Sequence, residues 1–168
     1  MRKLIPGVWM LPVLLAACRL PSAPAPPPVA VTPPPTMMSL EAEPGSGDGR
    51  IVERSRASGG QTLHLGPGER RRWTFGVRAS EGRYALSVTY SNGKEGENER
   101  LTFSVDGAIV SSFQDRDSGD ATEGWNLFVT DPAGIFALQD GAHTLVLDVS
   151  GGDGCVEIDR VSLSPVAQ

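Results

Sequence analysis

The apolar side chains of this chain recur with a period of two, and this feature most constrains its fold. Successive side chains of an extended strand point to opposite faces, so the period predicts strands that are buried on one face. Three segments show apolar residues at alternate positions: Tyr84, Leu86, Val88 and Tyr90; Leu101, Phe103 and Val105; and Leu145, Leu147 and Val149. The sequence therefore predicts paired strands around an apolar core.

Turn-forming residues separate these segments. Glycine stands next to aspartate or asparagine at Asn92-Gly93, Asp106-Gly107, Asp140-Gly141 and in the run from Gly151 to Gly154. Such pairs favour tight turns between antiparallel strands. No segment holds a helical period long enough to compete, so we predict an all-β fold, a β-sandwich of antiparallel strands.

The last predicted strand changes parity along its length. Val156 and Ile158 share one face, whereas Val161 and Leu163 fall on the opposite parity. One extra residue in the strand restores a common face, so we predict a β-bulge near Asp159 and Arg160.

The first eighteen residues have the layout of an export signal. Arg2 and Lys3 precede an uncharged apolar segment that is too short to span a membrane. Its end, Leu15-Ala16-Ala17-Cys18, resembles the lipobox of bacterial lipoproteins, in which the cysteine is lipidated and becomes the new amino terminus. Ordinary cleavage near Ala17, which would leave Cys18 free, is the alternative. Arg19 in place of aspartate suggests transfer to the outer membrane of a Gram-negative envelope.

Residues 19–37 are rich in proline and favour an extended, uncored conformation. At about 3.1 Å per residue, the stretch from Pro21 to Thr36 reaches up to roughly 50 Å as a spacer. A disordered tail without a spacing role is the alternative. Residues 38–168 remain for one domain, which is a usual single-domain size.

The charge and cysteine content exclude several classes. The formal net charge is -5, and loss of Arg2 and Lys3 makes it more negative, so nucleic acid and anionic membrane surfaces are poor partners. We interpret the basic run 70–72 as the start of a strand, and Trp73 as a core residue. With Cys18 lipidated, Cys155 has no partner in the chain, so no disulfide framework is expected.

Two carboxylates stand two residues apart at the start of the domain. In a strand, Glu41 and Glu43 lie side by side with Ala42 turned the other way. Calcium, which prefers oxygen ligands, would relieve their repulsion and could tie the first strand to the last. A solvated surface pair is the alternative interpretation.

The order of several fragments resembles carbohydrate-binding modules of families 6 and 35. These fragments span nearly all of residues 38–165 and are Glu41-Ala42-Glu43, Ala57-Ser58-Gly59-Gly60, the strand from Arg83 to Asn92, Val105-Asp106-Gly107, Gly124-Trp125, the segment from Gly141 to Leu145, and Ile158-Asp159. The resemblance implies a jelly-roll β-sandwich stabilised by calcium, with Glu41, Glu43 and Asp159 as metal ligands.

The same resemblance implies a sugar site at Trp125. An exposed indole offers a flat surface to the apolar face of a sugar ring, while polar neighbours bind the hydroxyls. A tryptophan that caps the core is the alternative. Where members of these families have a second aromatic residue, this chain offers only His64, and Glu157 stands in place of their asparagine.

No pattern of catalytic residues occurs in the chain. Nucleophile elbows, zinc-ligand spacings and phosphate loops are absent from the sequence. The acidic segment 115–120 has its glycine at the fifth position, out of register with an EF-hand loop, and we interpret it as an exposed acidic loop. We therefore expect a protein that is not an enzyme.

The expected function is that of a lipid-anchored protein of the cell envelope that binds a polysaccharide or glycan. Trp125, Glu157 and His64 are the expected carbohydrate-binding residues, and calcium is the expected structural cofactor. The alternative is a structural or adhesion lipoprotein whose sandwich binds another protein, with Trp125 as an interface anchor.

Overall fold

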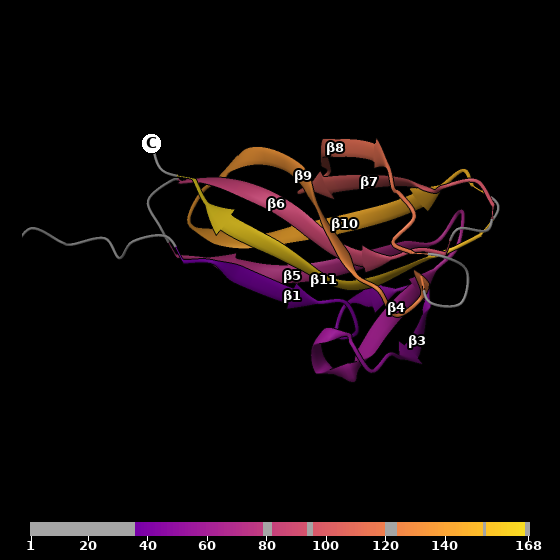
Figure 1. Ribbon diagram of the computed structural model, residues 1–168. Helices are drawn as coiled ribbons and strands as arrows, with labels where there is room; N and C mark the ends of the chain where they lie inside the picture. Colours follow the sequence, from indigo (N-terminus) through magenta and orange to yellow (C-terminus); the bar gives the residue numbers. More distant parts are fainter. Residues whose placement is uncertain (1–35, 79–81, 94–95, 120–123, 153, 167–168) are drawn as a thin grey trace, which may run out of the picture. The chain divides into compact units, whose positions relative to one another are not determined.

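The computed structural model describes residues 36–78, 82–93, 96–119, 124–152 and 154–166 (Figure 1). All of them lie in the second of the two units into which the chain divides, residues 32–168. The predicted signal peptide with Cys18 and nearly all of the predicted linker fall outside the described residues. No helix within the described ranges has the length and apolar character needed to cross a membrane.

Strands build the described domain, with a single short 3-10 turn, η1 (Ser58–Gly60). The strands are β1 (Met38–Glu41), β2 (Ser46–Gly47), β3 (Arg50–Glu53), β4 (Gln61–Leu65), β5 (Arg70–Val77), β6 (Gly82–Ser91), β7 (Arg100–Val105), β8 (Ala108–Gln114), β9 (Val129–Leu138), β10 (Gly141–Ser150) and β11 (Val156–Pro165). The all-β prediction is thus confirmed.

The strands form two antiparallel sheets, which Figure 1 shows as two layers. One sheet has the order β3-β4-β11-β6-β9, with β1 paired to β11 beside this path. The other has the order β2-β5-β10-β7-β8. Neighbours in space are mostly distant in sequence, as in a jelly roll.

The core lies between the sheets and follows the predicted alternation. Trp73, only 4% exposed, is a core residue as predicted. The three alternating segments each turn their apolar residues inward, and the core contains Tyr84, Leu86, Val88, Tyr90, Leu101, Phe103, Val105, Leu145, Leu147 and Val149. Burial of these side chains supplies the main driving force for the fold.

One edge of β11 changes its partner halfway along the strand. Residues 156–158 pair with β4, whereas residues 160–163 pair with β1. The register shifts between Ile158 and Arg160, which confirms the predicted bulge. Asp159 therefore lies where the ends of β1, β4 and the loop before β4 meet, although these segments are far apart in the sequence.

Candidate functional site

A polar row crosses the outer face of the six-stranded sheet at β3, β4 and β11. Arg50 pairs with His64, and His64 pairs with Glu157. Leu63 and Leu65 enter the core, so His64 between them points to the opposite face. The pairing thus gathers three polar side chains from three strands on one face.

Glu157 lies at the floor of this row and is 0% exposed. Arg54 donates two hydrogen bonds to its carboxylate, at 2.6 Å and 2.5 Å, and the Thr62 hydroxyl donates a third at 3.2 Å. Burial alone would raise the pKa of Glu157, but the hydrogen bonds from His64 and Arg54 and the charge of Arg54 outweigh it and lower the pKa. Glu157 is therefore held as an ion beneath a forked arginine.

His64 connects this buried pair with the surface. Its Nδ1 lies 3.4 Å from Glu157 Oε1, and Arg50 donates from Nη2 to its Nε2 at 3.3 Å. Because an arginine can only donate, Nε2 accepts and the ring proton sits on Nδ1, facing the carboxylate. The ring is thereby fixed in both orientation and tautomer.

Trp125 lies beside His64 and is half-buried. The two ring centroids are 6.1 Å apart, with the planes tilted by 41°. The indole packs on Gly93, where an added Cβ would lie 3.1 Å from Cε2 and Nε1. Its backbone carbonyl accepts from the Ser91 hydroxyl at 3.4 Å. The structure thus brings together Trp125, His64 and Glu157, the three predicted carbohydrate-binding residues.

Residues 124–128, which carry Trp125 and are called the Trp125 loop below, are held by hydrogen bonds from two sides. On one side, the Ser118 hydroxyl accepts from the Asn92 N–H at 2.9 Å and lies 2.8 Å from the Gly124 carbonyl oxygen. On the other, Asn126 accepts from the Arg56 N–H at 3.1 Å and donates to the Ser55 hydroxyl at 3.0 Å. The loop that follows β3 and the loop that carries Trp125 therefore form one continuous surface.

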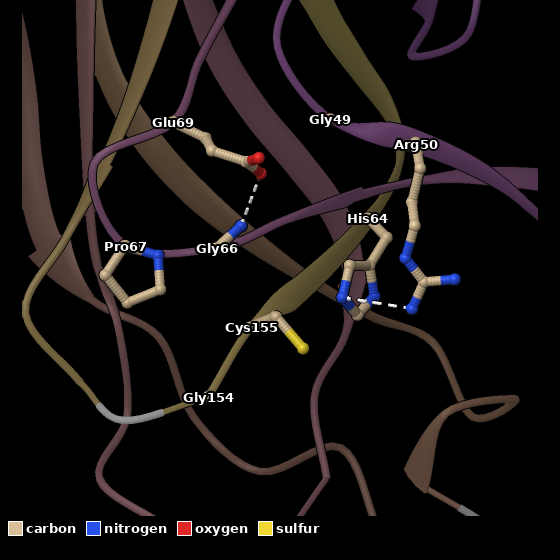
Figure 2. A pocket seen from close by; sticks show the side chains of 8 residues that line it. All are labelled: Gly49, Arg50, His64, Gly66, Pro67, Glu69, Gly154 and Cys155. Carbon is tan, nitrogen blue, oxygen red and sulfur yellow. Dashed lines mark hydrogen bonds between the residues drawn. The ribbon is translucent and has the colours of Figure 1, made fainter.

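An open pocket adjoins this surface, and His64 belongs to both (Figure 2). Its volume is about 460 Å³, within the usual range of small-molecule sites. Figure 2 shows Arg50, His64 and Cys155 on one side and the turn with Pro67 and Glu69 on the other. Cys155 is half-buried, and burial followed by the charge of Glu99 raises the pKa of its thiol.

The predicted metal ligands lie near the bulge of β11, where the pairing of this strand changes from β4 to β1. Glu41 Oε1 accepts from the Ser58 hydroxyl at 3.2 Å, and Asp159 Oδ1 accepts from the Ser58 N–H at 2.7 Å. Glu41 Oε2 is buried and has no hydrogen-bond partner. Ser58 thus joins the end of β1 to the bulge of β11.

Two carboxylates of this corner have raised pKa values, although Arg71 and Arg160 lie near them. Burial raises the pKa of Glu43, and the charges of Glu41 and Asp159 raise it further. Burial also raises the pKa of Asp159, with the charge of Glu41 adding to it. Across the described ranges, however, no group of three or more His, Cys, Asp or Glu side chains is clustered as a metal site. An orphaned carboxylate oxygen among mutually repelling carboxylates is nevertheless what a calcium site needs.

Asp115 corrects the interpretation of residues 115–120 as an exposed acidic loop. Asp115 is buried, and burial followed by the charge of Glu99 raises its pKa to about 7. The Asn92 amide donates to both carboxylates, at 3.0 Å to Glu99 and 3.2 Å to Asp115. The Asp115 N–H also donates to the Glu99 carbonyl at 2.9 Å. Asp117 is exposed as expected, and Asp120 lies outside the described residues.

Arg54 and Arg50 are site residues that the sequence interpretation missed. Arg50, Val52 and Arg54 are spaced two apart, which would place them on one face of a strand. That alternation indicates that the two arginine side chains point to the same face. Their partners were not predictable, since Arg54 reaches Glu157 across 103 positions of the chain.

No family model matches the chain, and no curated protein sequence does so either. Solved structures do match. A family 35 carbohydrate-binding module from Clostridium thermocellum has a TM-score of 0.65 at 20% identity, and the match covers 78% of this chain and 99% of that one. The C-terminal family 6 module of a marine laminarinase from Zobellia galactanivorans gives 0.61 at 13% identity, covering 77% and 99%.

An exo-β-1,3-galactanase from Phanerochaete chrysosporium also matches, with a TM-score of 0.61 at 22% identity. The match covers 77% of this chain but only 29% of that enzyme, so the chain spans less than a third of it. At these identities the likeness concerns the fold. The fold is that of family 6 and family 35 carbohydrate-binding modules, as the order of the sequence fragments predicted.

Proposed function

We propose that the β-sandwich binds a carbohydrate, without catalysing a reaction, on the surface formed by Trp125, His64 and Arg54. Solved structures that match over nearly their whole length are carbohydrate-binding modules, which supports a binding role for this fold. The observation that carries the proposal is the half-buried indole of Trp125, seated on Gly93 beside His64 and next to an open pocket.

The chemistry of the surface suits a sugar. The indole offers a flat apolar area to the C–H face of a sugar ring, and the neighbouring polar groups bind its hydroxyls. Arg54, whose side chain is 28% exposed, supplies hydrogen-bond donors. The side chain of Glu157 is only 1% exposed, so Glu157 acts on the ligand by holding Arg54 in place.

A calcium ion bound by Glu41, Glu43 and Asp159 belongs to the same proposal. The partnerless Glu41 oxygen and the raised pKa of Glu43 and Asp159 support it. When bound, the ion would add positive charge between these carboxylates and reduce their mutual repulsion. It would thereby connect the end of β1 to the bulge of β11 and keep the loop with Ser58 in position.

Anchoring to a membrane is proposed from the amino-terminal sequence. Lipidation of Cys18 would hold the domain at the cell envelope, in the outer membrane of a Gram-negative bacterium, with residues 19–37 as a spacer. In that arrangement the domain would hold a glycan near the cell surface.

Binding of the full chain to a glycan array, purified in mild detergent, tests the function. We expect Trp125→Ala to weaken binding by at least about tenfold, because the apolar platform is lost. Ile109→Ala is the matched control, since Ile109 is an apolar side chain, 72% exposed, in the other sheet. If the folded protein binds no glycan, the proposal is wrong and a protein-binding role replaces it.

A further inference from the structure

The candidate site is basic, whereas the whole chain is acidic. The formal net charge of the chain is -5. Yet Arg50, Arg54 and Arg56 all belong to β3 and the loop that follows it, next to His64 and the Trp125 loop. On this face Glu157 is the carboxylate that lies among them, and it is fully buried. Among the described residues of β3 and the loop after it, the charges on this face are therefore arginines, and Glu69 lies on the far side of the pocket.

The described carboxylates near this surface either accept hydrogen bonds from the protein or point away from the surface. Glu157 accepts from Arg54, Thr62 and His64. Glu69, on the far side of the pocket, accepts from the Gly66 N–H at 2.8 Å. Glu53 pairs with Gln61, one position out of step with Val52 and Arg54, and so points to the opposite face of β3.

Two of the arginines keep an uncompensated charge. Among the described residues, the salt bridge of this site joins Glu157 to Arg54, and neither Arg50 nor Arg56 forms one. Both side chains are exposed. Arg50 lines the pocket, and within the described part of the chain its side chain donates to a ring nitrogen, His64 Nε2, and to no carboxylate. An arginine in that state is suited to bind a carboxylate or a sulfate.

The arrangement places this charge next to the aromatic surface. His64 lies near both groups, because Arg50 Nη2 is 3.3 Å from its Nε2 and the Trp125 ring centroid is 6.1 Å from its own. One ligand can therefore contact the indole with a ring face and Arg50 with a charged substituent.

We propose that the glycan bound at this site is acidic, with a carboxylate or sulfate group at Arg50 in the pocket and a sugar ring on Trp125. This inference rests on the proposed function and names the ligand class of the same site. Arg50 determines the preference for an acidic ligand, and Arg56 adds to the positive potential at the Trp125 loop.

Calorimetric titration of the full chain in mild detergent tests the inference with matched polysaccharide pairs. Polygalacturonate is compared with fully methyl-esterified pectin for a carboxylate, and dextran sulfate with dextran for a sulfate. We expect one acidic member to bind at least about tenfold more tightly than its neutral counterpart. That preference should shrink when NaCl is raised from about 0.05 to about 0.5 M.

Two substitutions of the same type assign the effect to the site. Arg50→Gln should reduce affinity for the acidic member about 3- to 10-fold and reduce affinity for its neutral counterpart by a smaller factor. Arg83→Gln is the control, because Arg83 is exposed at the opposite end of β6 in the same sheet. Binding to the acidic polymer should also depend on Trp125, which attraction of a polyanion to the whole surface would not.

The outcomes separate the two proposals. A preference for an acidic member that Arg50→Gln and Trp125→Ala both reduce supports the inference. Equal, Trp125-dependent binding of neutral and acidic members overturns it while the proposed function stands. Binding of acidic polymers that neither substitution changes also overturns it. If no glycan binds to the folded protein, both proposals fail.

Discussion

Glu157 and Asp159 stand two residues apart on β11, yet the structure treats their charges in opposite ways. Both are buried, at 0% and 3% exposure. The pKa of Glu157 is lowered, because hydrogen bonds from His64 and Arg54 outweigh the effect of burial. The pKa of Asp159 is raised, because burial outweighs the hydrogen bond from the Ser58 N–H.

The difference shows that the direction in which the pKa of a buried carboxylate shifts depends on its hydrogen-bond donors and on the charges near it. Glu157 receives a full positive charge from Arg54 in a forked geometry. Asp159 receives one backbone hydrogen bond, a guanidinium at 4.0 Å and the repulsion of Glu41. The charge of Glu157 is therefore balanced by a group of the chain itself, whereas we expect a bound cation to stabilise the Asp159 end.

The largest expected effect comes from removing the cation at the Glu157 end. Arg54→Gln leaves a buried carboxylate without its ion pair, and we expect the free energy of unfolding to fall by about 3 kcal/mol. Urea unfolding followed by fluorescence measures this change.

A double variant provides the control. Arg54→Gln combined with Glu157→Gln removes both charges and should recover part of the lost stability. If Arg54→Gln alone costs less than about 1 kcal/mol, Glu157 is not stabilised by this pair and the comparison with Asp159 fails.

Calcium should act on the Asp159 end with a somewhat smaller effect. At a calcium concentration 100 times its dissociation constant, the folded state gains about 2.7 kcal/mol, which a thermal melt with and without chelator detects. Glu41→Gln should abolish most of this gain. In chelator the same variant should be at least as stable as the parent, because a mutual repulsion is removed.

Two results would count against this cation site. One is a midpoint that stays the same in calcium and in chelator. The other is a Glu41→Gln variant that loses stability equally in both conditions, which would indicate that Glu41 acts only through Ser58.

The smallest expected effect is a pair of opposite pH dependences. The pKa of Glu157 lies below its ordinary 4.5, so its stabilising contribution is present above pH 4.5 and is lost as pH falls through the folded-state pKa. The pKa of Asp159 lies above its ordinary 3.8, so its contribution is complete below pH 3.8 and is lost as pH rises through the folded-state pKa.

Unfolding curves in chelator from about pH 3 to 7 measure both dependences. Relative to the parent, Glu157→Gln should lose the rise of stability with pH, and Asp159→Asn should lose the fall. Slopes of the same sign for both residues would contradict the assignment of their partners.

The candidate site shows which of its parts were predictable from the sequence. Trp125, His64 and Glu157 were predicted, because the order of fragments around them resembles a known family. Arg54 was not, because its contact with Glu157 joins residues 103 positions apart. Asp115 was predicted to be exposed, since a cluster of acidic residues is usually solvated, and only the packing of Asn92 and Glu99 against it explains its burial.

The sequence by itself determined the strands and the parity of their side chains. A period of two is a local property of the sequence. We could therefore predict two features without knowing how the strands pair: the bulge near Asp159, and the inward direction of Tyr84, Leu86, Val88 and Tyr90. Only the tertiary structure decided which strands are neighbours, because pairing depends on contacts between distant segments. The pairing of β11 with β4 and then β1 placed Arg54 over Glu157 and left Asp159 among carboxylates.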